Sequence, residues 1–203
     1  MTAPSLIVIA GGSGSGKSHL ARQLRHTLGS RSAMMTLDHF YHDLAHLDPA
    51  QRELVNFDHP DAIDWAAVEA AVSRLSASLP AEIPRYDFAT HTRLKETERL
   101  DAAPLVILEG LWPLTRPALQ DASSLSIFIE CPADLRLARR IARDTVERGR
   151  SEESVRRQFL DHVAPMHELH VQSQASIADL IFPHDFGKAE IASLLNHPLL
   201  TNS

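Results

Sequence analysis

Apolar residues gather along this chain in short, nearly continuous runs rather than in an alternating pattern. Runs of this kind are typical of strands buried on both faces of a parallel sheet, whereas alternation is typical of a sheet with one face in water. Five runs predict strands: Leu6 to Ala10, Ala33 to Leu37, Leu105 to Leu108, Leu125 to Glu130 and the shorter Leu180 to Phe182.

Helical stretches lie between these runs. They are expected at Lys17 to Leu28, Trp65 to Ser78, Ala133 to Glu147 and, as one long helix, from about Glu152 to Ala178. Asp64 and Ser151 precede two of these stretches and are suitable N-caps, because their side-chain oxygens can accept from the first free N–H groups. Strands that alternate with helices predict βαβ units, and therefore an α/β fold with a doubly wound parallel sheet and helices on both faces.

Two segments depart from this alternation. Residues 79–99 hold Pro80 and Pro84 among aromatic and charged residues, which favours a loop or a short hairpin laid over the edge of the sheet. Lys188 to Ser203 predicts one short helix and a tail. At 203 residues the chain is long enough for one buried core, so we expect a single domain over residues 1–203.

Composition narrows the classes of function. The formal net charge of −6 gives the whole chain no electrostatic reason to bind nucleic acid or an anionic membrane. The single cysteine, Cys131, excludes an internal disulfide and fits a reducing compartment. The apolar run near the N-terminus is too short for a signal peptide or a membrane span, and no other run approaches membrane length. We therefore expect a soluble, cytoplasmic protein.

A glycine-rich loop follows the first predicted strand and opens the first predicted helix. It fits the pattern G-x-x-x-x-G-K-[ST] over Gly11, Gly12, Ser13, Gly14, Ser15, Gly16, Lys17 and Ser18. Glycines let the backbone N–H groups turn inward around phosphates, and the helix N-terminus adds its dipole. Lys17 would reach the β- and γ-phosphates, and the Ser18 hydroxyl would bind Mg²⁺. This phosphate-binding loop (P-loop) predicts a nucleoside triphosphate site.

Two acids close predicted strands next to this loop. Asp38 ends the second run and Glu109 follows the third. Ligands of open α/β sheets lie outside the carboxyl ends of the strands, so both carboxylates should face the γ-phosphate. Asp38 could orient an attacking hydroxyl or take its proton, and it is also a candidate residue of the metal site. Glu109 could hold Mg²⁺. A helix N-cap or a solvated strand end is the alternative for either acid.

Cations gather in one short region of this acidic chain, at Arg136, Arg140, Arg143, Arg148 and Arg150. The first three recur at helical spacing and share one stripe of the predicted helix. A solvated face, with Asp144 and Glu147 as ion-pair partners, is the alternative. Gly149 indicates a mobile turn, and an arginine-bearing lid is what phosphoryl transfer needs.

Longer motifs give the chain a family resemblance. In order, they read GGSGSGKS, LDHFYHDL, NFDHPDAID, PRYDFATHTR, ILEG and RRIARDTVERGR. Together they resemble the uridine–cytidine kinase family of P-loop kinases, from about Leu6 to Pro183. The resemblance implies transfer of the γ-phosphoryl group of ATP, with Mg²⁺, to the 5′-hydroxyl of uridine or cytidine in pyrimidine salvage. Relatives are commonly homotetramers, so a homo-oligomer is expected.

The resemblance also implies roles for single residues. Asp38 would act as base, Glu109 would help to hold Mg²⁺, and Arg143 and Arg148 would clamp the phosphates from a lid over about residues 140–152. Asp58 would bind the ribose hydroxyls, since one carboxylate can accept from both hydroxyls of a cis-diol. Arg140 and Gln158 would complete the sugar site, and Tyr86, His91 and Arg150 would reach the base. Tyr41, Phe57 and Phe88 would form apolar walls under the covering segment, about residues 79–99.

The C-terminal part departs from the family. Residues 173–179 lack the lysines that relatives carry there, and Phe186 lies in a turn that is glycine-rich in relatives. The resemblance places this region near the adenine of the donor, so we expect a looser and more apolar slot for the donor base. The histidine groups His39, His42 and His46, and His162, His167 and His170, lack a recognised metal-binding spacing.

Two other functions remain open. A related kinase of the phosphoribulokinase type would act on a sugar phosphate, but it would need further cations for the acceptor's phosphate and has no use for an aromatic wall. A nucleotide-binding regulator without catalysis is the other alternative. The joint presence of Lys17, Ser18, Asp38 and Glu109 argues against it, because a sensor needs no base.

Overall fold

The computed structural model describes residues 3–147 and 149–201. Its main sheet has five strands, all parallel, in the order β2-β5-β1-β6-β7. Their bounds are β1 Ser5–Gly11, β2 Ser32–Thr36, β5 Leu105–Gly110, β6 Ser123–Glu130 and β7 Leu180–Pro183. The predicted α/β fold with a parallel sheet is confirmed, and each of the five apolar runs forms a strand. The second strand ends one residue earlier than predicted, because Leu37 already begins a 3-10 turn, Leu37–Phe40.

Side chains of the central strand alternate between two separate cores. Val8 packs in the core shared with α3 (Trp65–Ser76) and the hairpin, whereas Ile9 packs in the core shared with α1 (Lys17–Leu28). Both side chains are fully buried. Since successive strand residues point to opposite faces, a continuous apolar run covers both faces at once. The short α4 (Pro117–Ala122) contributes Leu119 to the first core.

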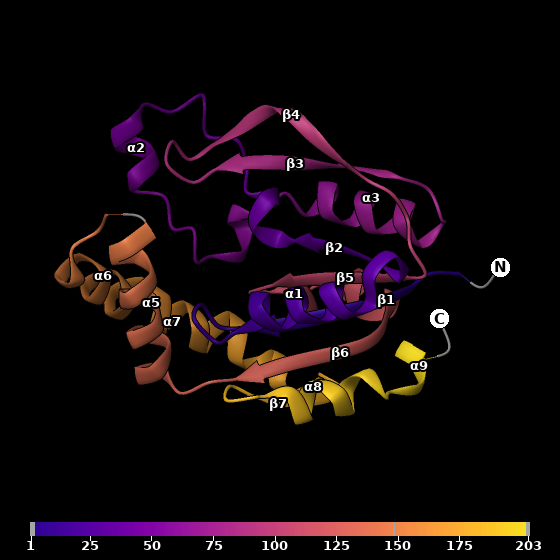
Figure 1. The fold of residues 1–203 in the computed structure, drawn as a ribbon. Helices are drawn as coiled ribbons and strands as arrows, with labels where there is room; N and C mark the ends of the chain where they lie inside the picture. Colours follow the sequence, from indigo (N-terminus) through magenta and orange to yellow (C-terminus); the bar gives the residue numbers. More distant parts are fainter. Residues whose placement is uncertain (1–2, 148, 202–203) are drawn as a thin grey trace.

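The C-terminal stretch forms two short helices rather than the one that was predicted. They are α8 (Lys188–Leu195) and α9 (Pro198–Thr201), and both pack on the α1 side of the sheet (Figure 1). Pro198 begins the second helix, where its missing N–H costs nothing. In the part of the chain that the structure describes, no helix is both long and apolar enough to cross a membrane.

The segment expected to cover the acceptor is an antiparallel hairpin of β3 (Ala81–Asp87) and β4 (Thr92–Leu100). It lies beyond the β2 edge in Figure 1, with the small helix α2 (Pro49–Glu53) beside its tip. Arg93 fastens the hairpin to the 3-10 turn after β2. Its guanidinium donates to the carbonyl oxygens of Tyr41 (2.8 Å) and Phe40 (3.1 Å) and pairs with Asp64 at 3.1 Å.

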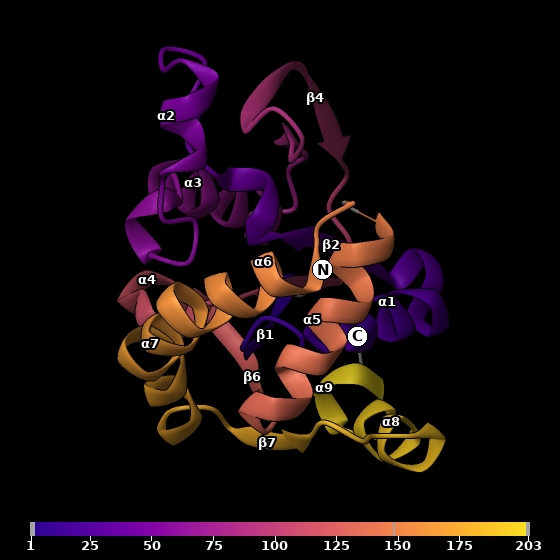
Figure 2. The same cartoon turned by 90° about the vertical axis from the view of Figure 1, so that its left-hand side faces the viewer.

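Helices also gather over the carboxyl ends of the strands, as Figure 2 shows from that side. They are α5 (Ala133–Glu147), α6 (Glu152–Gln158) and α7 (Ala164–Met166), with π-helical turns at Phe159–Val163 and His167–Val171 and a 3-10 turn at Gln172–Ser176. The prediction of one regular helix over 152–178 is therefore wrong in detail. Pro165 lies inside the stretch and has no N–H to donate, so wider turns replace the α-helical pattern beside it.

Candidate active site

The P-loop joins β1, at the centre of the sheet, to α1. Gly14 and Gly16 have φ of +82° and +108°, which side chains with a Cβ rarely adopt. A Cβ on Gly14 would also lie 2.6 Å from the carbonyl oxygen of Arg136. Lys17 begins α1 and is only 8% exposed. The loop thus has the backbone conformation and the buried cation that a phosphate cradle requires.

Two arginines of α5 form hydrogen bonds to this loop. Arg139 donates to the carbonyl oxygens of Gly14 (3.3 Å) and Ser15 (3.1 Å), and Arg140 donates to Ser13 Oγ at 3.0 Å. The sequence analysis named Arg140 but missed Arg139. Spacing could not reveal its role, because only the tertiary fold brings α5 to the P-loop across more than a hundred residues.

The two predicted acids lie beside the P-loop. Ser18 Oγ donates to Glu109 Oε1 at 3.1 Å, and Glu109 is buried. Burial raises the pKa of Glu109, Lys17 opposes this, and the negative charge of Asp38 adds to it. Asp38 is half-buried in the 3-10 turn after β2, where its N–H donates to Thr36 Oγ1 at 3.3 Å. Both acids therefore belong to one electrostatic site with Lys17.

This pair of side chains suits a magnesium ion. Glu109 Oε2 is buried and has no hydrogen-bond partner among the described residues, and Ser18 offers a hydroxyl oxygen beside it. Mg²⁺ prefers oxygen ligands and often takes only one or two carboxylates, because substrate phosphates and water complete its shell. Within residues 3–147 and 149–201, no group of three or more His, Cys, Asp or Glu residues could hold a metal.

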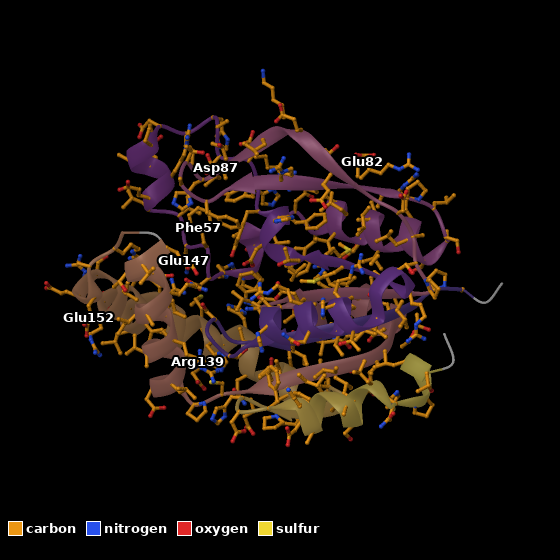
Figure 3. All side chains as sticks on the ribbon, in the orientation of Figure 1. Phe57, Glu82, Asp87, Arg139, Glu147 and Glu152 are labelled. Atoms are coloured by element: carbon orange, nitrogen blue, oxygen red, sulfur yellow. The ribbon has the colours of Figure 1, made fainter. Side chains whose placement is uncertain are left out.

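Aromatic side chains of three segments meet next to the acids. Tyr41 lies 5.4 Å from both Phe57 and Tyr86, Tyr86 lies 5.3 Å from Phe88, and Phe57 stacks on His91 at 4.5 Å between ring centroids. Figure 3 labels Phe57 on the side facing the lid helices. His91 has φ of +54°, an uncommon conformation for a residue with a Cβ, at the turn of the hairpin. The structure thus brings together the five rings of the predicted wall and base-facing set, whereas Arg150, the sixth member, contacts Gln158, Ser154 and Asp144.

Burial tunes the polar groups in this cluster. It raises the pKa of Tyr41 well above its ordinary value, with Asp38 and Asp58 adding to the effect, and the Tyr41 hydroxyl donates to the carbonyl oxygen of Phe57 at 3.1 Å. Burial likewise raises the pKa of Tyr86 to about 12. The pKa of Asp58 is also raised by burial, opposed by Arg140 and increased further by Asp38. Asp58 therefore lies within electrostatic reach of both the predicted base and the arginines.

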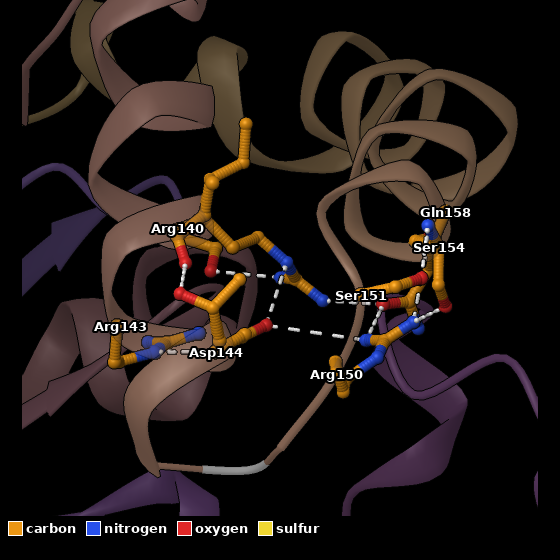
Figure 4. A network of polar contacts seen from close by, with 10 residues as sticks. Arg140, Arg143, Asp144, Arg150, Ser151, Ser154 and Gln158 are labelled. Carbon is orange, nitrogen blue, oxygen red and sulfur yellow. Dashed lines mark hydrogen bonds and ion pairs between the residues drawn. The ribbon is translucent and has the colours of Figure 1, made fainter.

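The predicted lid arginines converge on Asp144, which has no exposed side-chain surface (Figure 4). Arg143 Nε lies 2.8 Å from Oδ1, and Arg140 Nε and Arg150 Nη1 lie 3.5 and 3.9 Å from Oδ2. Gln158 Oε1 accepts from Arg140 at 2.8 Å and also from Arg150. The alternative of a solvated helix face is wrong for Arg136, Arg140 and Asp144, since all three are buried. Arg148 lies outside the described residues.

The departing C-terminal turn packs against the opposite side of the P-loop. Phe186 stacks on His19 at 5.7 Å, and a Cβ placed on Gly16 would lie 3.5 Å from the Phe186 ring. Arg139, labelled in Figure 3, donates to the carbonyl oxygen of His184 at 3.1 Å. The turn is thus joined to the P-loop on the β6–β7 side, across β1 from Asp38 and Glu109.

Comparisons with known proteins identify the family of this chain. The model of the Phosphoribulokinase / Uridine kinase family matches residues 6–188. A uridine kinase of Chloroflexus aurantiacus is 42% identical over 183 residues, covering 90% of this chain and 88% of the relative. A uridine kinase of Staphylococcus carnosus is 38% identical over 206 residues, covering 97% and 99%.

Solved structures show the same fold at lower identity. Phosphoribulokinase from Rhodobacter spheroides aligns with a TM-score of 0.66 at 16% identity, covering 89% of this chain and 70% of that one. D-glycerate 3-kinase from Cryptococcus neoformans aligns with 0.65 at 19%, covering 91% and 87%. The family model matches residues 6–188 of this chain, and the P-loop, the two acids and the lid arginines lie in one site. This chain therefore belongs to the phosphoribulokinase/uridine kinase family.

Proposed function

We propose that this protein is a pyrimidine nucleoside kinase, which transfers the γ-phosphoryl group of ATP to the 5′-hydroxyl of uridine or cytidine. Relatives that are 37–42% identical over about nine-tenths of the chain carry the name uridine kinase. Membership of the family implies ATP as the phosphoryl donor. The products would be UMP or CMP, as in pyrimidine salvage.

One observation carries the proposal: the carboxylates of Asp38 and Asp58 and the aromatic cluster lie together on the β2–β5 side of the P-loop. Asp38 raises the pKa values of both Asp58 and Tyr41, so the proposed base, the proposed sugar-binding acid and the aromatic wall lie within electrostatic range of one another. A cis-diol suits Asp58, and a flat base suits stacked rings. Phe186 and His19 lie across β1, where the donor base would be held opposite the acceptor.

Each charged residue has a task in the proposed transfer. Asp38 would orient the 5′-hydroxyl and accept its proton as the oxygen attacks the γ-phosphorus. Lys17 and the P-loop N–H groups would hold the β- and γ-phosphates, and Arg143 with Arg148 would neutralise charge on the transferred group. Mg²⁺, held by Ser18 and Glu109 with Asp38 nearby, would supply charge neutralisation on the phosphate oxygens. Positioning and charge account for most of the rate in such a transfer.

The base-facing residues explain why both pyrimidines would be accepted. Uracil offers a carbonyl acceptor at the edge where cytosine offers an amino donor. Neutral His91 can present either an N–H or a bare nitrogen, depending on its tautomer, so it can pair with both. Tyr86 and Phe88, in contact at 5.3 Å, would limit the width of the slot and disfavour purines. The sugar would be held by Asp58, Arg140 and Gln158, and Arg150 would reach the base.

A coupled assay tests the proposal directly. The purified protein is given MgATP and, in turn, uridine, cytidine, adenosine, guanosine and ribulose 5-phosphate. We expect turnover with the two pyrimidine nucleosides and poor turnover with the purines. Comparable activity on adenosine, or activity only on the sugar phosphate, would overturn the assignment. Asp38→Asn is the matched inactive control, because an amide keeps the shape but cannot take the proton.

Two wider features of the protein remain proposals. We expect a homotetramer, which sedimentation equilibrium measures on the purified chain. We also expect the protein to act in the cytoplasm, because its one cysteine fits a reducing compartment. Fluorescence microscopy of the tagged protein in its own host checks the location.

A further inference from the structure

Arg136 is a buried cation that forms no ion pair with a carboxylate of the described residues. It is 2% exposed, and no ion pair within 4.0 Å is formed by it in the described part of the chain. Its Nε donates to the carbonyl oxygen of Cys131 at 3.2 Å, and its guanidinium lies 5.6 Å from the centre of the Phe159 ring. Nη1 is buried without a hydrogen-bond partner among the described residues. An unsatisfied buried donor is costly, so this nitrogen needs an acceptor nearby.

His167 is a buried ring with one free nitrogen, on the π-helical turn His167–Val171. It is 6% exposed, and its Nε2 lies 3.0 Å from Gln172 Oε1. Because Gln172 offers its carbonyl oxygen, Nε2 carries the proton and Nδ1 keeps a lone pair. Nδ1 is buried and has no hydrogen-bond partner among the described residues. The ring is therefore an acceptor without a donor.

The unpaired donor, Arg136 Nη1, and the unpaired acceptor, His167 Nδ1, both lie beside one glycine of the P-loop. A Cβ placed on Gly12 would lie 2.8 Å from Arg136 Nη1 and 2.8 Å from His167 Nδ1. The two nitrogens thus lie on either side of the same point beside the loop, although no hydrogen bond joins them in this structure. Their chemistry is complementary only while His167 is neutral, since a protonated ring would place a second cation beside the guanidinium.

The surroundings keep His167 neutral. Burial lowers the pKa of His167, and Arg136 lowers it further, while the Gln172 hydrogen bond and Glu168 act in the opposite direction. His167 also lines a small pocket, together with Ser13, Asp58, Leu111, Val163, Met166 and Val171. Asp58, the acid of the proposed sugar site, lines the same pocket. The ring therefore connects the lid helices, the acceptor side and the back of the P-loop.

We propose that His167 is a positioning residue for the donor triphosphate: its neutral ring lets the Arg136 guanidinium lie beside Gly12, and protonation of the ring repels the guanidinium and weakens nucleotide binding. Arg136 is also where α5 touches Gly14 through its backbone oxygen, and its helix carries Arg139 and Arg140, which bind the loop. A shift of Arg136 would thus be transmitted to the phosphate cradle. The inference rests on donor binding at the P-loop and not on the identity of the acceptor.

Calorimetric binding of the Mg²⁺ complex of a non-hydrolysable ATP analogue, without acceptor, tests this role. The variants are His167→Phe, which removes both nitrogens, and His167→Gln, which keeps an acceptor and cannot be protonated in this range. At about pH 8 we expect His167→Phe to bind roughly fivefold or more weakly and His167→Gln to stay within about twofold of wild type. From about pH 8 to about pH 5.5, wild type should lose more affinity than His167→Gln, because the nucleotide's own protonation affects both proteins equally.

Controls separate positioning from a general loss of structure. His170→Phe changes a histidine of the same turn that contacts His59 instead, and it should leave nucleotide affinity unchanged. The double variant Arg136→Met/His167→Phe should bind no more weakly than Arg136→Met alone, since His167 acts through Arg136.

Three results would overturn the inference. They are wild-type affinity in His167→Phe, equal losses of affinity on acidification in wild type and His167→Gln, and additive losses in the double variant. If His167→Phe does not fold, the pH comparison of wild type with His167→Gln decides the question alone.

Discussion

Asp144→Asn is the change that most directly tests the electrostatic design of the lid. The Asp144 side chain has no exposed surface, and Arg143, Arg140 and Arg150 place guanidinium nitrogens 2.8, 3.5 and 3.9 Å from its oxygens. The substitution keeps the shape of the side chain and removes its negative charge. The three cations would then face one another across a buried amide.

The magnitude follows from the burial of each partner. Removing one member of a buried ion pair costs about 3–5 kcal/mol, because the remaining charge stays desolvated. Arg140 is only 7% exposed, but Arg143 and Arg150 keep 36% and 28% of their side-chain surface in water and can rehydrate. We therefore expect the lower end of the range, about 3 kcal/mol of unfolding free energy. For a chain of this length that corresponds to a decrease in Tm of roughly 6–12 °C.

Urea unfolding followed by circular dichroism measures the change in a protein free of nucleotide. Glu152→Gln is the matched control, since it breaks the ion pair with Arg156, at 2.7 Å, whose members are 57% and 53% exposed. An exposed pair contributes about 0.5 kcal/mol or less, so this variant should unfold almost like wild type. A loss below about 1 kcal/mol in Asp144→Asn would refute the idea that the lid arginines depend on a buried counter-charge.

Three further predictions concern the reaction and the site. Asp38→Asn should abolish turnover while calorimetry shows ATP and uridine binding within about tenfold of wild type, and substantial residual turnover would remove Asp38 from the role of base. Glu109→Gln should raise Tm in the absence of nucleotide and remove Mg²⁺-dependent activity. The folded-state pKa of Glu109 is raised, so its charge increasingly destabilises the fold as the pH rises above the ordinary range for a glutamate. The gain in Tm of Glu109→Gln should therefore vanish at lower pH. A difference in Tm between the two proteins that stays the same across this pH range would contradict the prediction. Wild type should use GTP and dATP with kcat/KM within about tenfold of ATP, because a stacking wall does not read a base edge, and Phe186→Ala should lower kcat/KM for all purine donors alike; a preference for ATP beyond about a hundredfold would show that other residues read the adenine.

Much of the fold could be predicted from local pattern. The apolar runs form the five parallel strands because each strand of a sheet covered on both faces must be apolar on both faces. Successive residues of such a strand are therefore apolar, which a local pattern shows. The P-loop is equally local, since Gly14 and Gly16 satisfy a backbone need within the loop itself. The regular helix expected over residues 152–178 failed where Pro165 forces wider turns, a consequence that the helical pattern alone does not reveal.

The candidate site was predictable where one short motif carries it, and not where the fold assembles it. Ser18 and Glu109 could be named in advance, because Ser18 completes the P-loop motif and Glu109 follows the third apolar run, and the structure joins them by a hydrogen bond at 3.1 Å. The aromatic wall was named only through a family resemblance, because Tyr41, Phe57 and Tyr86 come from separate segments.

What the sequence alone determined was therefore the set of strands, the phosphate loop and the acids at the strand ends, all of which depend on neighbouring residues. Only the tertiary structure decided that Arg139 holds the back of the P-loop, that Asp144 is the buried centre of the lid arginines and that His167 faces Arg136 across Gly12. Charged and aromatic side chains acquire these roles from burial and from partners distant in sequence. Burial and distant partners are properties of packing, and no local pattern of residues encodes them.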